Sequence, residues 1–234
     1  MQNIHQISER LNRYFGPTGP RFFLLFLFLL GLLILYPFAV KSTTSGGYYL
    51  FRAVSSVVLL LSIYAVSFRR GFLFFALVLA VPTAIHHVLQ REGDVNAFAI
   101  VNAVLSFVFD TFVILVIFRR VFLRGKVTTE TVYGALCIYL LLGFGFASVY
   151  GMLGDLQPKA FYLDPQTNLH TVPDRFDLIY YSFGTMTSLG AAGITAVSSQ
   201  ARSITVIEAT LGVLYLAVLI SRLMSSYRES FSAQ

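Results

Sequence analysis

The sequence carries little charge. Asp, Glu, Lys and Arg make up 12% of its 234 residues, whereas hydrophobic residues make up 56%. A soluble domain usually carries about twice that share of charged residues. The composition therefore excludes an ordinary soluble protein and indicates a polytopic membrane protein. The net charge of +6 comes without a basic patch on a polar fold, so we expect no nucleic acid among the partners.

Cysteine is almost absent as well. Cys137 is the single cysteine, so an intrachain disulfide and a cysteine-based metal framework are both excluded. We expect it to be a small buried hydrophobic residue. The motifs H-E-x-x-H and G-x-S-x-G are missing, as is a pair of aspartates within the apolar segments. We therefore expect neither an enzyme nor a resident cofactor.

Six apolar segments are long enough, or nearly so, to cross a bilayer as helices. They run over about residues 21–40, 48–68, 71–89, 97–118, 131–152 and 202–224, and Pro82 should bend the third. Eleven of the 17 Lys and Arg residues fall on the inner side if both termini are inside. The positive-inside rule therefore predicts a multi-pass protein of the cell membrane with both termini in the cytoplasm.

An uncharged, glycine-rich stretch lies between the fifth and sixth segments. It reads YYSFGTMTSLGAAGIT and runs from Tyr180 to Thr195. Irregular backbone at membrane depth is tolerated only where protein buries it or where it lines a water-filled path. We therefore interpret the stretch as the re-entrant loop of an ion pore, preceded by a pore helix over about residues 176–187.

The region from Val127 to Met224 resembles the pore module of the potassium-channel superfamily, in which a pore helix ends in T-T-V-G-Y-G-D and an inner helix follows. FDLIYYSFGTMT is similar to the family's pore helix, and ITAVSSQARSITVIEATLGVLYLAVLISRL is similar to its linker and inner helix. An ungapped alignment places the selectivity filter on Thr187, Ser188, Leu189, Gly190, Ala191, Ala192 and Gly193.

The resemblance implies an all-α membrane protein with six transmembrane helices and a re-entrant pore helix between the last two. Because a filter of converging carbonyls needs several loops around one axis, it also implies a homotetramer in a lipid bilayer. The chain would divide into a cytoplasmic segment (1–20), a four-helix transmembrane domain in the voltage-sensor position (21–120), a pore domain (121–226) and a short cytoplasmic tail (227–234).

The fourth apolar segment, 97–118, contains no Lys or Arg, and its only charge is Asp110. Voltage gating draws on basic residues that cross the field, each worth about 2.3 kcal/mol per 100 mV. We therefore predict that the chain has no intrinsic voltage sensor.

The filter departs from the family's pattern at its outer half. The family's filter needs positive φ at both glycines, which glycine adopts at little cost. Gly190 keeps the first, but Ala192 replaces the second and would cost roughly 1 to 2 kcal/mol per chain in a left-handed conformation. A shift of one residue would make Gly193 the second glycine, at the loss of the match at Ile194 and Thr195.

Two further substitutions remove groups that hold the family's outer filter. Ala191 lacks the aromatic ring and Gly193 lacks the carboxylate. We therefore predict a loosened outer mouth and a channel that conducts K⁺, and also Na⁺, with weak selectivity. The alternatives are a potassium-selective channel that uses lower sites at Ser188, Leu189 and Gly190, or a non-conducting scaffold or sensor with a channel fold.

Residues behind the filter are expected to support it. Glu208 lies one to two turns into the inner helix, where a carboxyl needs a partner such as Tyr180, Tyr181 or a pore-helix hydroxyl. We expect this contact to hold the filter rather than to bind ions. Gly212, in the middle of the inner helix, is interpreted as a gating hinge or as a close-packing site.

Asp174 and Asp177, near the start of the pore helix, either cap it or attract ions. Polar residues also lie within or beside the first four segments, namely Arg52, His86, His87, Asn102 and Asp110. We favour hydrogen bonds between helices for these. The alternative is a pH or ligand sensor built on His86 and His87, because histidine titrates near neutrality.

Overall fold

The computed structural model describes residues 21–40, 46–66, most of 71–81, 97–123, 127–168 and 170–232. Helices dominate these residues, and a small two-stranded sheet joins two of the loops. The elements are α2 (Arg21–Val40), α3 (Gly46–Val66), α5 (Ala97–Leu123), α6 (Thr129–Leu156), β1 (Phe161–Leu163), α7 (Arg175–Met186), β2 (Ile194–Ala196) and α8 (Ser199–Ser232).

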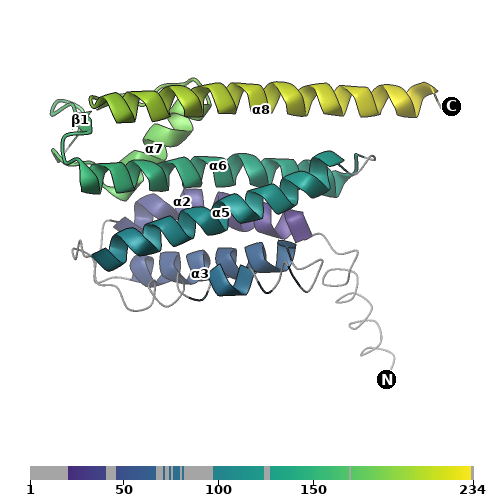
Figure 1. The fold of residues 1–234 in the computed structure, drawn as a ribbon, viewed down its shortest axis with the longest axis horizontal. Helices are drawn as coiled ribbons and strands as arrows, with labels where there is room; N and C mark the ends of the chain where they lie inside the picture. Colours follow the sequence, from purple (N-terminus) through teal and green to yellow (C-terminus); the bar gives the residue numbers. More distant parts are fainter. Residues whose placement is uncertain are drawn as a thin grey trace.

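The long helices lie side by side, and α6 is at the centre of the arrangement. Figure 1 shows α8 along one edge of the molecule, with α6 next to it and the short α7 wedged between them near β1. On the other side of α6 lie α2 and α5, and α3 packs against α2. This arrangement brings α7 into contact with both helices that flank it in sequence.

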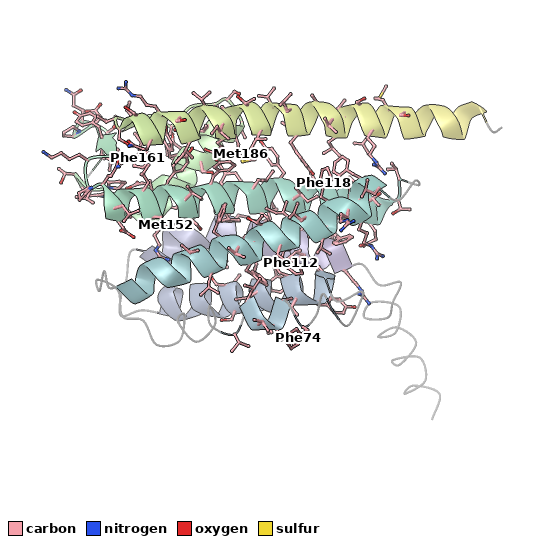
Figure 2. The ribbon with its side chains drawn as sticks, viewed as in Figure 1. Phe74, Phe112, Phe118, Met152, Phe161 and Met186 are labelled. Atoms are coloured by element: carbon pink, nitrogen blue, oxygen red, sulfur yellow. The ribbon has the colours of Figure 1, made fainter. Side chains whose placement is uncertain are left out.

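The main apolar core lies where α2, α5 and α6 meet. Its most deeply buried side chains include Leu25 and Leu29 of α2, Ile117 of α5, and Cys137 and Ile138 of α6. Cys137 is fully buried, in agreement with the expectation of a small hydrophobic residue. A second cluster, around Tyr150, Phe161 and Tyr181, lies at the β1 end of the molecule. Figure 2 shows Phe161 at this end and Met186 between α6 and α8.

Two of the described helices are long and apolar enough to cross a membrane, namely α6 and the part of α8 from Ser199 to Ser225. They correspond to the predicted fifth and sixth segments, and both extend beyond the predicted bounds. α8 continues to Ser232, through most of the segment expected to be a tail. α5 likewise runs past Phe118 to Leu123. The third predicted segment lies largely outside the described residues.

The all-α prediction omitted the sheet. Leu163 pairs with Ile194 and Phe161 with Ala196, so β1 and β2 form an antiparallel pair. β1 belongs to the segment before the pore helix, and β2 directly follows the predicted filter. The pairing therefore joins the residues directly after the predicted filter to a segment that lies before the predicted pore helix.

Candidate ion pore

The predicted pore helix, α7, begins at a reciprocal cap. The Asp174 carboxylate accepts a hydrogen bond from the Asp177 backbone N–H at 2.9 Å, and the Asp177 carboxylate accepts one from the Asp174 N–H at 2.9 Å. Both acidic groups are placed where the helix dipole stabilises negative charge. Of the two sequence interpretations, the structure supports capping for both residues.

His170 contacts the same cap from the preceding loop. Its Nε2 lies 2.6 Å from Asp177 Oδ2. The hydrogen bond to Asp177 raises the pKa of His170 above its usual value, and the negative charges of Asp177 and Asp174 act in the same direction. Protonation of this imidazole therefore strengthens a contact at the start of the pore helix.

Glu208 of α8 is fully buried behind the pore helix. Its Oε1 lies 2.5 Å from the Ser182 hydroxyl of α7, and its Oε2 lies 2.5 Å from the Tyr150 hydroxyl of α6. The sequence analysis had proposed a pore-helix hydroxyl as one partner, which Ser182 supplies. It missed Tyr150, and the structure shows no hydrogen bond from Glu208 to Tyr180 or Tyr181. One carboxyl group thus joins α6, α7 and α8.

The two tyrosines of the pore helix make other contacts. The Tyr181 hydroxyl lies 2.9 Å from the Thr205 hydroxyl of α8. The Tyr180 hydroxyl accepts a hydrogen bond from the Ala192 backbone N–H at 3.2 Å. Tyr180 therefore touches the predicted filter directly, whereas Tyr181 and Glu208 hold the helix that precedes it.

Gly212 is a close-packing position. A Cβ there would lie 2.7 Å from the backbone oxygen of Met186, the last residue of α7. Glycine at this point lets the inner helix approach the carboxyl end of the pore helix. The predicted hinge role of Gly212 stays a prediction, because α8 is continuous in this structure.

Gly184, which the sequence analysis did not select, is also a close-packing position, where α7 meets the predicted filter loop. A Cβ on Gly184 would lie 2.8 Å from the Gly190 carbonyl oxygen, and the Gly190 N–H donates to the Gly184 carbonyl at 3.0 Å. A glycine within a short helix costs helix stability relative to alanine. That cost is the sequence signal that could have pointed to a close backbone approach here.

The predicted filter follows α7 as an irregular loop. Positive φ occurs at Ser188 (58°), Gly190 (81°) and Gly193 (81°), and Ser188 is the only non-glycine residue with positive φ in the described part of the chain. Ala192 does not adopt the left-handed conformation, so the cost considered for it does not arise here. The second glycine with positive φ is Gly193, the residue that the one-residue shift would make the second glycine, but it lies three residues after Gly190 rather than two.

The carbonyl groups of the loop fall into two sets. In the outer set, the Ala191 oxygen accepts from the Ile194 N–H at 3.2 Å, and the Gly193 oxygen accepts from Asp164 and Asn168. The Gly190 oxygen lies against Gly184. Within the described residues, no hydrogen-bond donor reaches the carbonyls of Thr187, Ser188 and Leu189. Cations could therefore be coordinated at these three residues without breaking a hydrogen bond of the loop.

Of the remaining polar candidates, only Asp110 has a side chain that the structure describes. His86 and His87 lie outside the described residues, as do the side chains of Arg52 and Asn102. Asp110 is half-buried in the middle of α5, on a helix that packs against α6 away from the filter. The sensor hypothesis for His86 and His87 thus stays a prediction.

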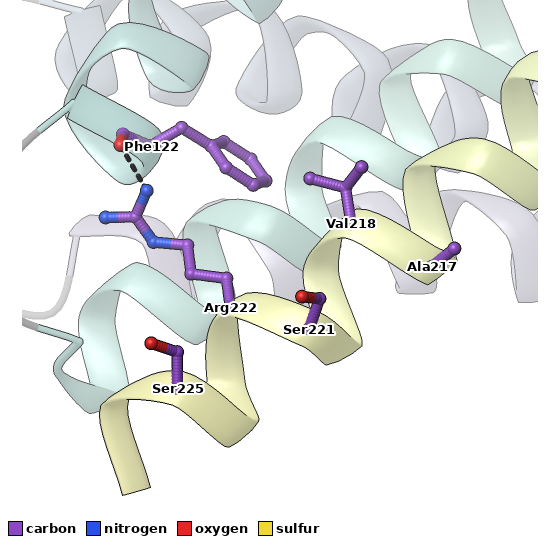
Figure 3. Close-up of a pocket in the computed structure, with 6 residues that line it drawn as sticks. All are labelled: Phe122, Ala217, Val218, Ser221, Arg222 and Ser225. Atoms are coloured by element: carbon purple, nitrogen blue, oxygen red, sulfur yellow. Dashed lines mark hydrogen bonds between the residues drawn. The ribbon is translucent and has the colours of Figure 1, made fainter. Parts of the chain in front are cut away.

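An open groove lies at the other end of α8, where it passes the end of α5. Figure 3 shows Arg222 of α8 donating to the Phe122 carbonyl, with Val218 and Ser221 among the other α8 residues that line the groove. The guanidinium also lies 5.3 Å from the centroid of the Phe122 ring. This contact ties the linker after the fourth predicted segment to the predicted cytoplasmic end of the inner helix.

Comparison with known proteins gives one family match. Residues 136–229 match the model of a family described as "Ion channel". The match supports membership of this part of the chain in the potassium-channel superfamily. The matched region takes in most of α6 and all of α7, the filter loop and most of α8, which is the arrangement that the resemblance implied. No curated protein and no solved structure gives a significant match.

The family match and the two long apolar helices identify a membrane protein with an ion-channel domain. The match covers Glu208, its partners and the predicted filter loop, and it does not extend over α2, α3 or α5.

Proposed function

We propose that the chain is the subunit of a homotetrameric cation channel of the cell membrane, without intrinsic voltage sensing and with weak selectivity between K⁺ and Na⁺. The observation that carries this proposal is the channel domain itself, in which a capped pore helix ends in a loop with unengaged carbonyl groups. Such carbonyls replace the water shell of a permeating cation in this superfamily.

The lower part of the loop supplies the cation ligands in this proposal. The Thr187 hydroxyl donates to the Phe183 carbonyl at 2.6 Å, which turns its oxygen lone pairs toward other partners. α7 ends directly before Thr187, and the dipole at its carboxyl end favours a cation there. Thr187, Ser188 and Leu189 would therefore form the ion-binding rings, and the outer residues Ala191 to Gly193 would form the mouth.

A single chain leaves this site incomplete. The Leu189 side chain is 82% exposed, although it lies in the filter loop. Exposed faces of α8 also carry apolar side chains, including Val206, Leu211, Leu214 and Val218. In a membrane channel, such faces pack against neighbouring subunits or line the pore and contact lipid. Four copies around one axis would bring the loops together and cover Leu189.

A non-conducting scaffold with a channel fold is the second candidate. The observation in its favour is that the protein itself occupies the carbonyls of Ala191 and Gly193 and packs that of Gly190 against the pore helix. Fewer open carbonyls leave fewer consecutive ion sites. A potassium-selective channel that uses the lower sites is the third, and it differs from the main proposal only in its permeability ratio.

The test uses the full-length protein, purified in detergent and reconstituted into liposomes. Mass measurement of the purified complex should give four chains, and liposomes should show cation current. The matched control is Gly190→Asp, which places a side chain at a residue with a φ of 81° and a charge in the filter loop. Current in the wild type that is absent in the control supports the channel. An assembled wild-type protein without current supports the scaffold.

A further inference from the structure

The outer end of the filter is held by a turn that precedes the pore helix. β1 ends at Leu163, and the chain then turns through residues 164–168. The Asp164 carboxylate accepts from the Gln166 N–H at 3.0 Å, and the Asp164 carbonyl accepts from the N–H groups of Thr167 and Asn168. The Asn168 side chain also donates to the Asp164 carbonyl at 3.0 Å. The turn is therefore closed by hydrogen bonds among its own residues.

Two donors from this turn reach the same filter oxygen. The Gly193 carbonyl accepts from the Asp164 backbone N–H at 2.8 Å and from Asn168 Nδ2 at 2.9 Å. The Asp164 bond extends the β1–β2 ladder by one step beyond the Leu163–Ile194 pair. A carbonyl oxygen has two lone pairs, and both are engaged here. The Gly193 carbonyl is therefore not open to a permeating ion.

Glycine is required at this contact. Gly193 has a φ of 81°, and a Cβ there would lie 2.1 Å from the Thr167 hydroxyl and 2.8 Å from Asn168 Nδ2. The position that carries a carboxylate in the resembled family thus carries no side chain, and the turn occupies that space. The sequence analysis inferred a loosened outer mouth from the missing carboxylate. The turn provides a separate attachment for that end of the filter.

On the basis of the proposed channel function, we infer that Asn168 is a positioning residue that fixes the outer end of the filter and limits ion coordination to the residues below Gly193. Its amide acts through the Gly193 carbonyl and does not touch the ion. The Asp164 N–H belongs to the backbone and remains in any variant, so Asn168 is the only part of this attachment that a side-chain substitution removes directly.

The test compares full-length variants in liposomes under gradients of K⁺ against Na⁺ and of K⁺ against Cs⁺. Asn168→Ala removes the amide donor. Asn168→Asp keeps the shape and replaces the donor with a carboxylate oxygen, which cannot donate to Gly193. The control is Gln166→Ala, an exposed side chain in the same turn. Both Asn168 variants should change at least one permeability ratio by about threefold or more, within the range expected for loss of the Asn168–Gly193 hydrogen bond in each chain. Gln166→Ala should leave both ratios unchanged.

Hydrogen–deuterium exchange gives a second measurement on the same proteins. Both Asn168 variants should speed exchange over residues 190–196 and leave α7 protected as in the wild type. If the Asn168 variants assemble and conduct with the permeability ratios of the wild type, the inference is overturned. The channel proposal would still stand in that case. Loss of assembly in both variants, with Gln166→Ala intact, would assign Asn168 a structural role only and also overturn it. Absence of current in the wild type would instead contradict the proposed function.

Discussion

The Ser182 hydroxyl lies 2.5 Å from Glu208 Oε1 and 2.8 Å from the Gly143 carbonyl oxygen, and both of these oxygens are acceptors when Glu208 is ionised. A hydroxyl has one proton to donate. If Ser182 donates to Gly143, the short contact with Glu208 needs a proton on the carboxyl group. A neutral Glu208 would then donate to Ser182 and accept from Tyr150, which satisfies every group in this buried cluster.

This proton arrangement predicts different outcomes for two substitutions at Glu208. Glu208→Gln supplies a donor for Ser182 and an acceptor for Tyr150, so its thermal stability and current should be close to those of the wild type. Glu208→Ala leaves two buried hydroxyl groups without their partner and opens a cavity, and it should destabilise the protein by about 2 to 4 kcal/mol. Thermal unfolding of the purified proteins in detergent measures both. Equal destabilisation by the two variants would show that Glu208 is ionised.

The contact between Gly212 and Met186 predicts that α8 tolerates no side chain at this point. In Gly212→Ala, the new methyl group would lie 2.7 Å from the Met186 backbone oxygen, which the end of α7 holds in place. Overpacking of this kind costs about 1 to 3 kcal/mol. The matched control is Gly145→Ala in α6, where nothing lies within 4 Å of the added carbon. A melting temperature for Gly212→Ala as high as that of Gly145→Ala would contradict the close packing.

His170 gives the protein a pH-dependent contact outside the spanning helices. Because its pKa is raised in the folded state, the folded protein binds more protons than the unfolded protein near neutral pH. The contribution of His170 to stability should be complete below its ordinary pKa of 6.5 and should disappear as the pH rises through the raised value. Its magnitude should be small, because the side chain is 46% exposed and solvent screens the pair.

The measurement for His170 is the difference in melting temperature between the wild type and His170→Ala, followed from below pH 6.5 upward through the raised pKa of His170. The difference should shrink as the pH rises. In Asp177→Asn, NMR of labelled histidine should show the pKa of His170 falling back toward its ordinary value. A difference that grows with pH would have the wrong sign for this contact.

Much of the helical framework could be predicted from sequence because it depends on long apolar runs and on local caps. The predicted first segment coincides with α2, and the predicted pore helix differs from α7 by one residue at each end. The capping role of Asp174 and Asp177 was also open to prediction, because both partners lie within four residues of each other.

The contacts that hold the filter could not be predicted in the same way, because they join residues far apart in the chain. Tyr150 and Glu208 are 58 residues apart, and Asn168 and Gly193 are 25 residues apart. Neither pair follows from a helical or strand period. β1 and β2 have three residues each, too few for a clear alternation, although the turn-forming residues after Leu163 were a usable signal.

Voltage dependence should be weak. Residues 97–118 of α5 contain no basic side chain, and Arg119 and Arg120 follow only after the predicted membrane segment. Each gating charge that crosses the field would supply about 2.3 kcal/mol per 100 mV. We expect the voltage dependence of the steady-state open probability to correspond to less than about one such charge per chain. A steep voltage dependence that is lost when residues of α5 are substituted would contradict this prediction.

The most direct test of the channel proposal is the reversal potential of liposome currents with K⁺ on one side of the membrane and Na⁺ on the other. We predict cation current that reverses near zero, because the proposed ligands at Thr187, Ser188 and Leu189 would provide few consecutive sites. The current should be absent in Gly190→Asp. A reversal near the potassium equilibrium potential would contradict weak selectivity, and an assembled protein without current would contradict the channel itself.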